Sequence, residues 1–148
     1  MLIEVKVKVA RIIDGKTRKR TETFIVDDCE LFSNAEYRVM ACLVHEQEDG
    51  VVESFEVQSL RISPIKEVCT QFSGDFQYII TLKDIWLADD GTEKELKYKV
   101  LLNASDLSGA TTNAHTLARQ GYEMQIEGIK QVEYEYVHAN QPTENSNG

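Results

Sequence analysis

The sequence predicts an α+β protein made of two tandem ββαβ repeats with pseudo-two-fold symmetry, each a mostly antiparallel sheet with one helix. Three observations predict this fold: alternating apolar residues on both sides of Asp-Gly pairs, one helical pattern in each half, and an internal repeat. The chain has 148 residues, 42% of them apolar, which is enough for a core. We expect repeats at 1–62 and 76–137, a linker at 63–75 and a disordered polar tail at 138–148.

The first repeat starts with "VKVKVARIIDG", where apolar residues alternate and lead into Asp14-Gly15, a hairpin signal. "RTETFIV" returns as the second strand. "CELFSNAEYRVMACLVHEQ" has apolar residues every three or four positions and predicts a helix, with Ser33 and Glu36 as a capping box. "SFEVQSLRI" is the third strand, and Pro64 ends it.

The second repeat follows the same order. "FQYIITLKDIWLADDG" runs into Asp90-Gly91, "EKELKYKVLL" returns, "SDLSGATTNAHTLARQG" predicts a helix, and "YEMQIEGIKQVEYEYV" is the third strand. Both third strands skip one position in their alternation, at Gln58-Ser59 and at Glu127-Gly128. This shared irregularity predicts a β-bulge at the same place in each repeat. Strand order, and whether the repeats form one sheet or two, stay open.

Most aromatic residues fall on the inward positions of the predicted strands. We expect a core position for Phe24, Phe76, Tyr78 and Tyr98. Trp86 lies close to the second hairpin tip, where a core position is favoured over a partly exposed contact point. The alternation in "EYEY" predicts a half-buried edge strand for Tyr134 and Tyr136, ahead of a base-stacking platform.

The sequence favours a non-enzymatic protein. It contains no phosphate-binding glycine motif and no nucleophile elbow. None of the three histidines has a spacing that predicts metal binding or nucleophilic catalysis: His45, His115 and His138. We therefore expect no catalytic residue, no metal, no cofactor and no small-molecule substrate.

Composition also indicates where the protein acts. Three widely spaced cysteines without a C-x-x-C motif indicate reduced thiols, as in a cytoplasmic protein. No stretch approaches the ~18 apolar residues of a membrane span, and the alternating N-terminus is typical of a strand, not of a secretory signal. We expect no membrane partner.

The charge is strongly asymmetric. The net formal charge is -9, yet seven cations face two carboxylates in residues 1–20, a net of +5, so the rest carries -14. These cations can gather on one side of the first hairpin and follow a phosphate backbone. They are the candidate nucleic-acid-binding residues: Lys6, Lys8, Arg11, Lys16, Arg18, Lys19 and Arg20.

The second hairpin carries the opposite charge. Its candidate protein-interaction residues are Trp86, Asp89, Asp90, Glu93 and Glu95. Three interpretations compete: two solvated hairpins, binding of single-stranded DNA through the basic hairpin, and protein-protein association. The leading prediction is nucleic-acid binding. The alternative is a protein-interaction or phage assembly module that self-associates through its oppositely charged hairpins.

A family resemblance accompanies this layout. The hairpins, the helix entries "VDD" and "LNASDL", and the strands "VQSLRI" and "IEGIKQ" resemble an uncharacterised domain family of Bacteroidetes and their crAss-like phages. The resemblance covers residues 3–137. It implies a cytoplasmic bacterial or phage protein and brings no activity and no catalytic residues. For a phage protein it implies a role in DNA metabolism, of the single-strand-binding kind, or in the virion or host interaction.

Overall fold

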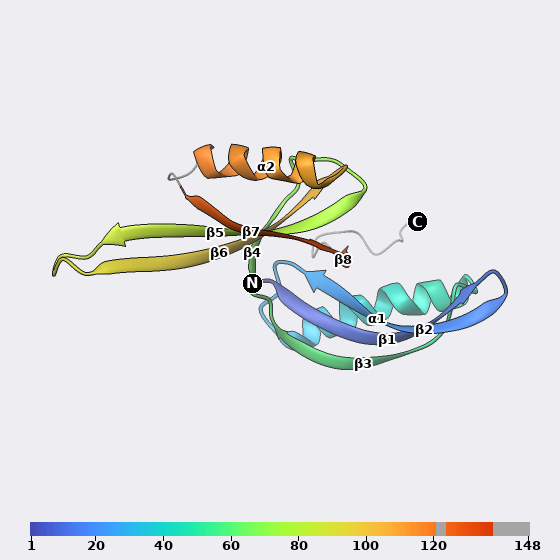
Figure 1. Ribbon diagram of the computed structural model, residues 1–148. Coiled ribbons are helices and arrows are strands. Elements are labelled where there is room, and N and C mark those ends of the chain that lie inside the picture. The colour runs from blue at the N-terminus through green and yellow to red at the C-terminus, as the bar shows by residue number, and fades with distance from the viewer. Residues whose placement is uncertain (121–123, 138–148) are drawn as a thin grey trace. The chain divides into compact units, whose positions relative to one another are not determined.

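The computed structural model describes residues 1–120 and 124–137. Within them the fold is mixed α+β, with two helices and eight strands in two sheets (Figure 1). The described chain divides into two compact units, Met1–Ser63 with the strand Tyr134–Val137, and Pro64–Glu133. The tail expected at 138–148, with His138, lies outside the described residues.

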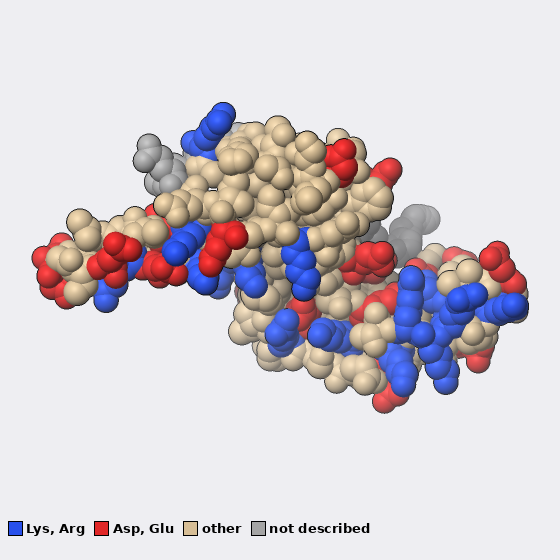
Figure 2. Space-filling model, viewed as in Figure 1, with Lys and Arg blue, Asp and Glu red and all other residues tan. Residues whose placement is uncertain are grey.

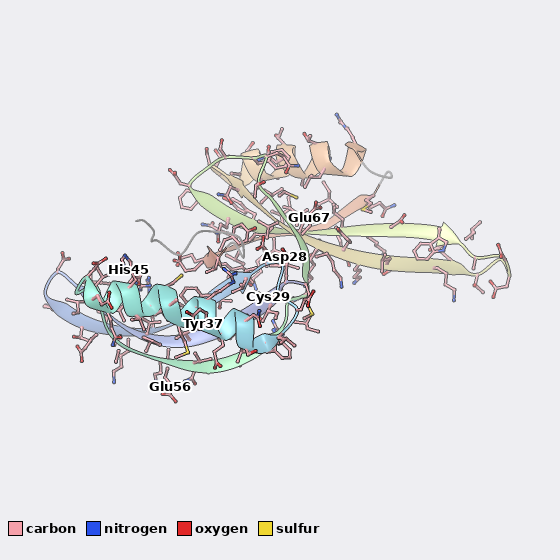
Figure 3. All side chains as sticks on the ribbon, turned by 180° about the vertical axis from the view of Figure 1, so that it is seen from behind. Asp28, Cys29, Tyr37, His45, Glu56 and Glu67 are labelled. Carbon is pink, nitrogen blue, oxygen red and sulfur yellow. The ribbon has the colours of Figure 1, made fainter. Side chains whose placement is uncertain are left out.

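Unit 1 has a four-stranded sheet in the order β3-β1-β2-β8 with α1 on one face (Figures 1 and 3). Its elements are β1 (Ile3–Ile13), β2 (Lys16–Val26), α1 (Phe32–Glu48), β3 (Val52–Ile62) and β8 (Tyr134–Val137). β1 is antiparallel to both β2 and β3, and β8 is parallel to β2. Alternate β1 residues from Ile3 to Val9 are buried with Ala35, Val39 and Leu43 of α1, as the sequence pattern predicts.

Unit 2 has a four-stranded sheet in the order β4-β6-β5-β7, with α2 on one face (Figure 1). Its elements are β4 (Ile65–Cys69), β5 (Phe76–Leu87), β6 (Glu93–Ala104), α2 (Leu107–Gln120) and β7 (Gln125–Val132). Ala110, Ala114 and Ala118 form one buried stripe of α2 and pack with Tyr78, Ile80 and Leu82 of β5. The stretch 63–75, expected as a linker, contains β4, which pairs in parallel with β6.

The bulge predicted in each third strand is confirmed. On β3, Ser59 pairs with Lys6 and Val57 with Val7, which leaves Gln58 as an extra residue. On β7, Gly128 pairs with Thr81 and Ile126 with Leu82, which leaves Glu127 as the extra residue. One inserted residue restores the inward direction of the apolar positions that follow it.

Two local predictions are wrong. The predicted capping box of Ser33 is absent, because α1 begins at Phe32 and its N-cap residue Leu31 makes no side-chain cap hydrogen bond. Phe24 and Tyr78 are buried and Tyr98 packs against the core, but Phe76 is 46% exposed. Phe76 is the first residue of β5, where the sheet ends and fewer neighbours cover a side chain.

Candidate nucleic-acid interface

The β1–β2 hairpin turns at Asp14 and Gly15, which have φ values of 52° and 75°. Two consecutive left-handed residues make the tight turn whose twist suits antiparallel strands, and Asp-Gly is a favoured pair for it. The turn places Ile13 opposite Lys16 and thereby fixes every pair farther along the two strands. This register decides on which face each cation lies.

The cations lie on both faces of the hairpin. Paired residues share a face, and successive residues alternate between faces. Arg11 pairs with Arg18, and Arg20 pairs with Val9, a core residue under α1, so these arginines lie on the α1 side. Lys6, Lys8 and Lys19 lie on the opposite side. The expectation that the basic residues gather on one side is therefore wrong.

On the α1 side, the arginines form an ion-pair network with carboxylates. Arg11 holds Glu22 with two hydrogen bonds, one of them 2.7 Å from Nη2 to Oε1, and also donates from Nη1 to Oε2 of Glu46 at 2.8 Å. Arg20 donates from Nε to Glu22 at 2.9 Å. The side chains of Arg11 and Glu22 are only 12% and 7% exposed.

Glu22 keeps its charge in this network. Burial pushes the pKa of Glu22 upward, but hydrogen bonds from Arg11 and then Arg20 outweigh it, so the pKa lies below its ordinary value. The hydrogen bond to Glu22 likewise raises the pKa of the Arg11 guanidinium. Arg11 and Arg20 therefore serve the fold, and a ligand would compete with Glu22 for them.

The face opposite α1 presents lysines that form no ion pair with a described residue. We call Lys6, Lys8 and Lys19 the open basic face; all three are exposed, and no ion pair joins them to another described residue. Thr21 lies opposite Lys8, and Thr23 lies opposite Lys6. Figure 2 shows Lys and Arg side chains gathered over this hairpin. Ammonium groups beside hydroxyls are the donors that a phosphate backbone requires.

The base of the same face contains a cation and aromatic residues. Glu4, only 3% exposed, forms an ion pair with Arg61 of β3, which the sequence analysis did not single out. The strand pairing could have revealed this ion pair, because Arg61 on β3 lies directly opposite Glu4 on β1. Tyr134 lies opposite Thr23, and Tyr136 donates a hydrogen bond to Asp27. Both tyrosines are half-buried, as predicted for this strand.

The remaining two candidate nucleic-acid-binding residues, Lys16 and Arg18, lie at the tip of the β1–β2 hairpin. Both are exposed and make no ion pair with another described residue. Ile12 and Ile13 beside them are each 39% exposed. The tip is thus basic and partly apolar, unlike the open basic face.

Comparison with known proteins gives a family. The sequence profile of a family described as "Domain of unknown function (DUF4494)" matches residues 1–140. The chain belongs to the DUF4494 family. No curated protein and no solved structure matches this DUF4494 chain.

The second hairpin of the DUF4494 chain, β5–β6, holds the acidic candidates. Asp90 accepts hydrogen bonds from the backbone N–H of Thr92 at 3.0 Å and from its hydroxyl at 2.6 Å, which lowers the pKa of Asp90. Glu95 forms an ion pair with Lys83 at 3.2 Å. Asp89 and Glu93 are exposed and form no ion pair with another described residue.

Trp86 is 46% exposed, so the core position that the sequence favoured is wrong. The reason lies in its neighbours. β7 pairs with β5 only as far as Lys83, and β4 pairs with β6 only from Lys99 onward. Trp86 therefore lies on a two-stranded extension that none of the other described strands flanks.

Metal-ligating residue types are dispersed over the described part of the chain. Within that part, no group of three or more His, Cys, Asp and Glu side chains is arranged to hold a metal ion. His45 is exposed on α1 (Figure 3), and its Nε2 atom lies 3.5 Å from Oδ2 of Asp49. Neither described helix has the length and apolar composition that crossing a membrane requires.

Proposed function

We propose that this DUF4494 protein is a non-enzymatic binding protein that holds single-stranded nucleic acid, preferably DNA, on the open basic face of unit 1. One observation carries the proposal: Lys6, Lys8 and Lys19 point to one side of the sheet without ion pairs to described residues, whereas Arg11 and Arg20 are tied to Glu22. Lysines on a sheet that form no ion pair attract phosphates, and their binding releases the counterions of the nucleic acid.

The spacing of the face suits a single strand. Lys6 and Lys8 are two residues apart on β1, roughly 6.6 Å. Lys19 lies on β2 opposite Ala10, so it is diagonal to Lys8 at about 7–8 Å. Tyr134, Thr23 and Lys6 form one row across three strands. A half-buried aromatic beside cations on a sheet is typical of proteins that stack the exposed bases of single strands.

We also infer that the two units are copies of one ββαβ repeat. In each sheet the first strand of the ββαβ repeat, β1 or β5, is paired with the second and the third, and a short strand, β8 or β4, lies parallel beside the second. The extra residue on β3 and the one on β7 occupy matching positions. On this inference both copies keep the hairpin between the first two strands of the repeat and differ in the charge that it carries.

The proposal includes a cytoplasmic location in bacteria or in their phages, within the Bacteroidetes range that the resemblance implies. Cys29 and Cys69 are buried thiols. Burial raises the pKa of the Cys69 thiol to about 11, which keeps it protonated and unreactive. Thiols of this kind suit a reducing compartment.

The test is fluorescence anisotropy of a labelled single-stranded oligonucleotide titrated at several salt concentrations. We expect Lys6→Gln with Lys8→Gln to weaken binding and to reduce the log–log salt slope by about 1.4, because two phosphate contacts are lost at about 0.7 each. Lys66→Gln with Arg119→Gln removes the same charge from exposed positions of unit 2 and should change little. A flat wild-type titration at low salt, or equal losses in both variants, contradicts the proposal.

A further inference from the structure

The β5–β6 hairpin carries a large exposed apolar surface. We call its distal part, Asp84–Leu87 and Glu93–Leu96 with the turn between them, the arm; Figure 1 shows it extending well past α2 within unit 2. Four of its large apolar side chains are exposed: Ile85 37%, Trp86 46%, Leu87 72% and Leu96 53%. Single exposed apolar residues are ordinary, but four close together at the end of one projecting hairpin mark an interaction site.

Both faces of the arm present this apolar surface. Trp86 lies opposite Lys94, and Leu96 is two residues farther on the same face, within reach of an indole ring. Ile85 and Leu87 are neighbours on the other face. A two-stranded ribbon without flanking strands is marginally stable in water, so covering these side chains would also stabilise the arm.

The arm carries five carboxylates and one lysine, Asp84, Asp89, Asp90, Glu93 and Glu95 against Lys94. Asp89 and Glu93 are exposed at the arm's end without an ion pair to another described residue. A fitting occupant is therefore partly apolar and basic. The tip of the β1–β2 hairpin has this composition, since Ile12 and Ile13 are half-exposed beside Lys16 and Arg18, which also lack ion pairs to described residues.

We infer that the arm of one chain docks on the β1–β2 hairpin tip of a second copy, so that the protein self-associates head to tail. Apolar contact around Trp86 supplies attraction, and the opposite charges at Asp89 and Glu93 against Lys16 and Arg18 fix the orientation. Such a heterologous contact closes into a small oligomer or continues as a chain, according to the rotation between copies.

Trp86 provides a direct readout, because it is the chain's single tryptophan. On association its emission should shift to shorter wavelength and its quenching by acrylamide should fall as protein concentration rises. Light scattering should show a parallel rise in mass. Both effects should weaken with salt, because added ions screen exposed charges beyond about 8 Å at physiological ionic strength.

Paired charge reversals make the contact specific. Asp89→Lys with Glu93→Lys leaves both hairpin tips, residues 12–18 and 87–93, basic, and Lys16→Glu with Arg18→Glu leaves both tips acidic. Asp90 is kept because it accepts hydrogen bonds from Thr92. Each variant alone should associate at least roughly tenfold more weakly than wild type. An equimolar mixture of the two should recover association, because each variant then meets its complement.

The matched control reverses exposed charges elsewhere, Asp75→Lys with Glu67→Lys in unit 2, and should associate as wild type does. Wild-type protein that stays monomeric with an unchanged Trp86 spectrum overturns the inference. So does an arm reversal that weakens association when the tip reversal does not, or a mixture that recovers nothing. The readouts need no nucleic acid, and the open basic face is unaltered in both variants.

Discussion

At the scale of single residues, Glu22 decides how the basic hairpin is used. Its buried carboxylate accepts hydrogen bonds from Arg11 and Arg20, which removes two of the seven cations from the surface available to a ligand. Arg11 also reaches Glu46 on α1 and so ties the hairpin to the helix. A count of charges along the chain therefore overstates the basic surface, because buried carboxylates neutralise part of it.

We predict that Glu22→Gln destabilises the protein by about 2–3 kcal/mol at neutral pH, because Arg11 keeps a poorly compensated, largely buried charge. Since the folded-state pKa of Glu22 is lowered, its contribution is complete above its ordinary value of 4.5 and is lost as pH falls through the folded value. The difference from wild type should thus shrink in acid. Urea unfolding across this range measures it, with exposed Glu48→Gln of α1 as a control that should differ little from wild type.

At the scale of elements, Gly74 sets how β5 begins beside the end of β6. Its φ is +155°, and a Cβ on it would lie 2.1 Å from the backbone carbonyl carbon of Ala104, the last residue of β6. Its own carbonyl accepts a hydrogen bond from Asn103 at 3.3 Å. Only a residue without a side chain permits this approach.

We predict that Gly74→Ala destabilises unit 2 by more than about 2 kcal/mol, because the obstacle is backbone and cannot rotate away. Gly128→Ala is the matched control. Gly128 lies next to the extra residue of β7, yet a Cβ there would meet nothing within 4 Å. Thermal unfolding should separate the two variants clearly, and an equal loss in both would contradict the role assigned to Gly74.

At the scale of the whole molecule, the features that the sequence predicts are those set by residues close to one another in the chain. The Asp-Gly turns, the alternating strands and the bulges are local patterns. The faces of the cations were also readable, because counting outward from Asp14-Gly15 places Arg11 opposite Arg18. The parallel pairings of β4 with β6 and of β8 with β2 could not be predicted, because nothing in these two short segments indicates which strand each one pairs with. The exposure of Trp86 likewise depends on where β7 and β4 stop pairing.

The return of the chain to unit 1 gives the last prediction. β8 pairs with Thr23–Val26 of β2, and Val137 is 8% exposed in the core of unit 1. A chain ending at Glu133 should therefore lose hydrogen-exchange protection along β2, while β5 of unit 2 keeps its protection, because its partners β6 and β7 are intact. A chain ending at Val137 retains β8 and should match the full-length protein. Equal loss of protection in β2 and β5 would mean that the two units unfold as one, which the separate cores argue against.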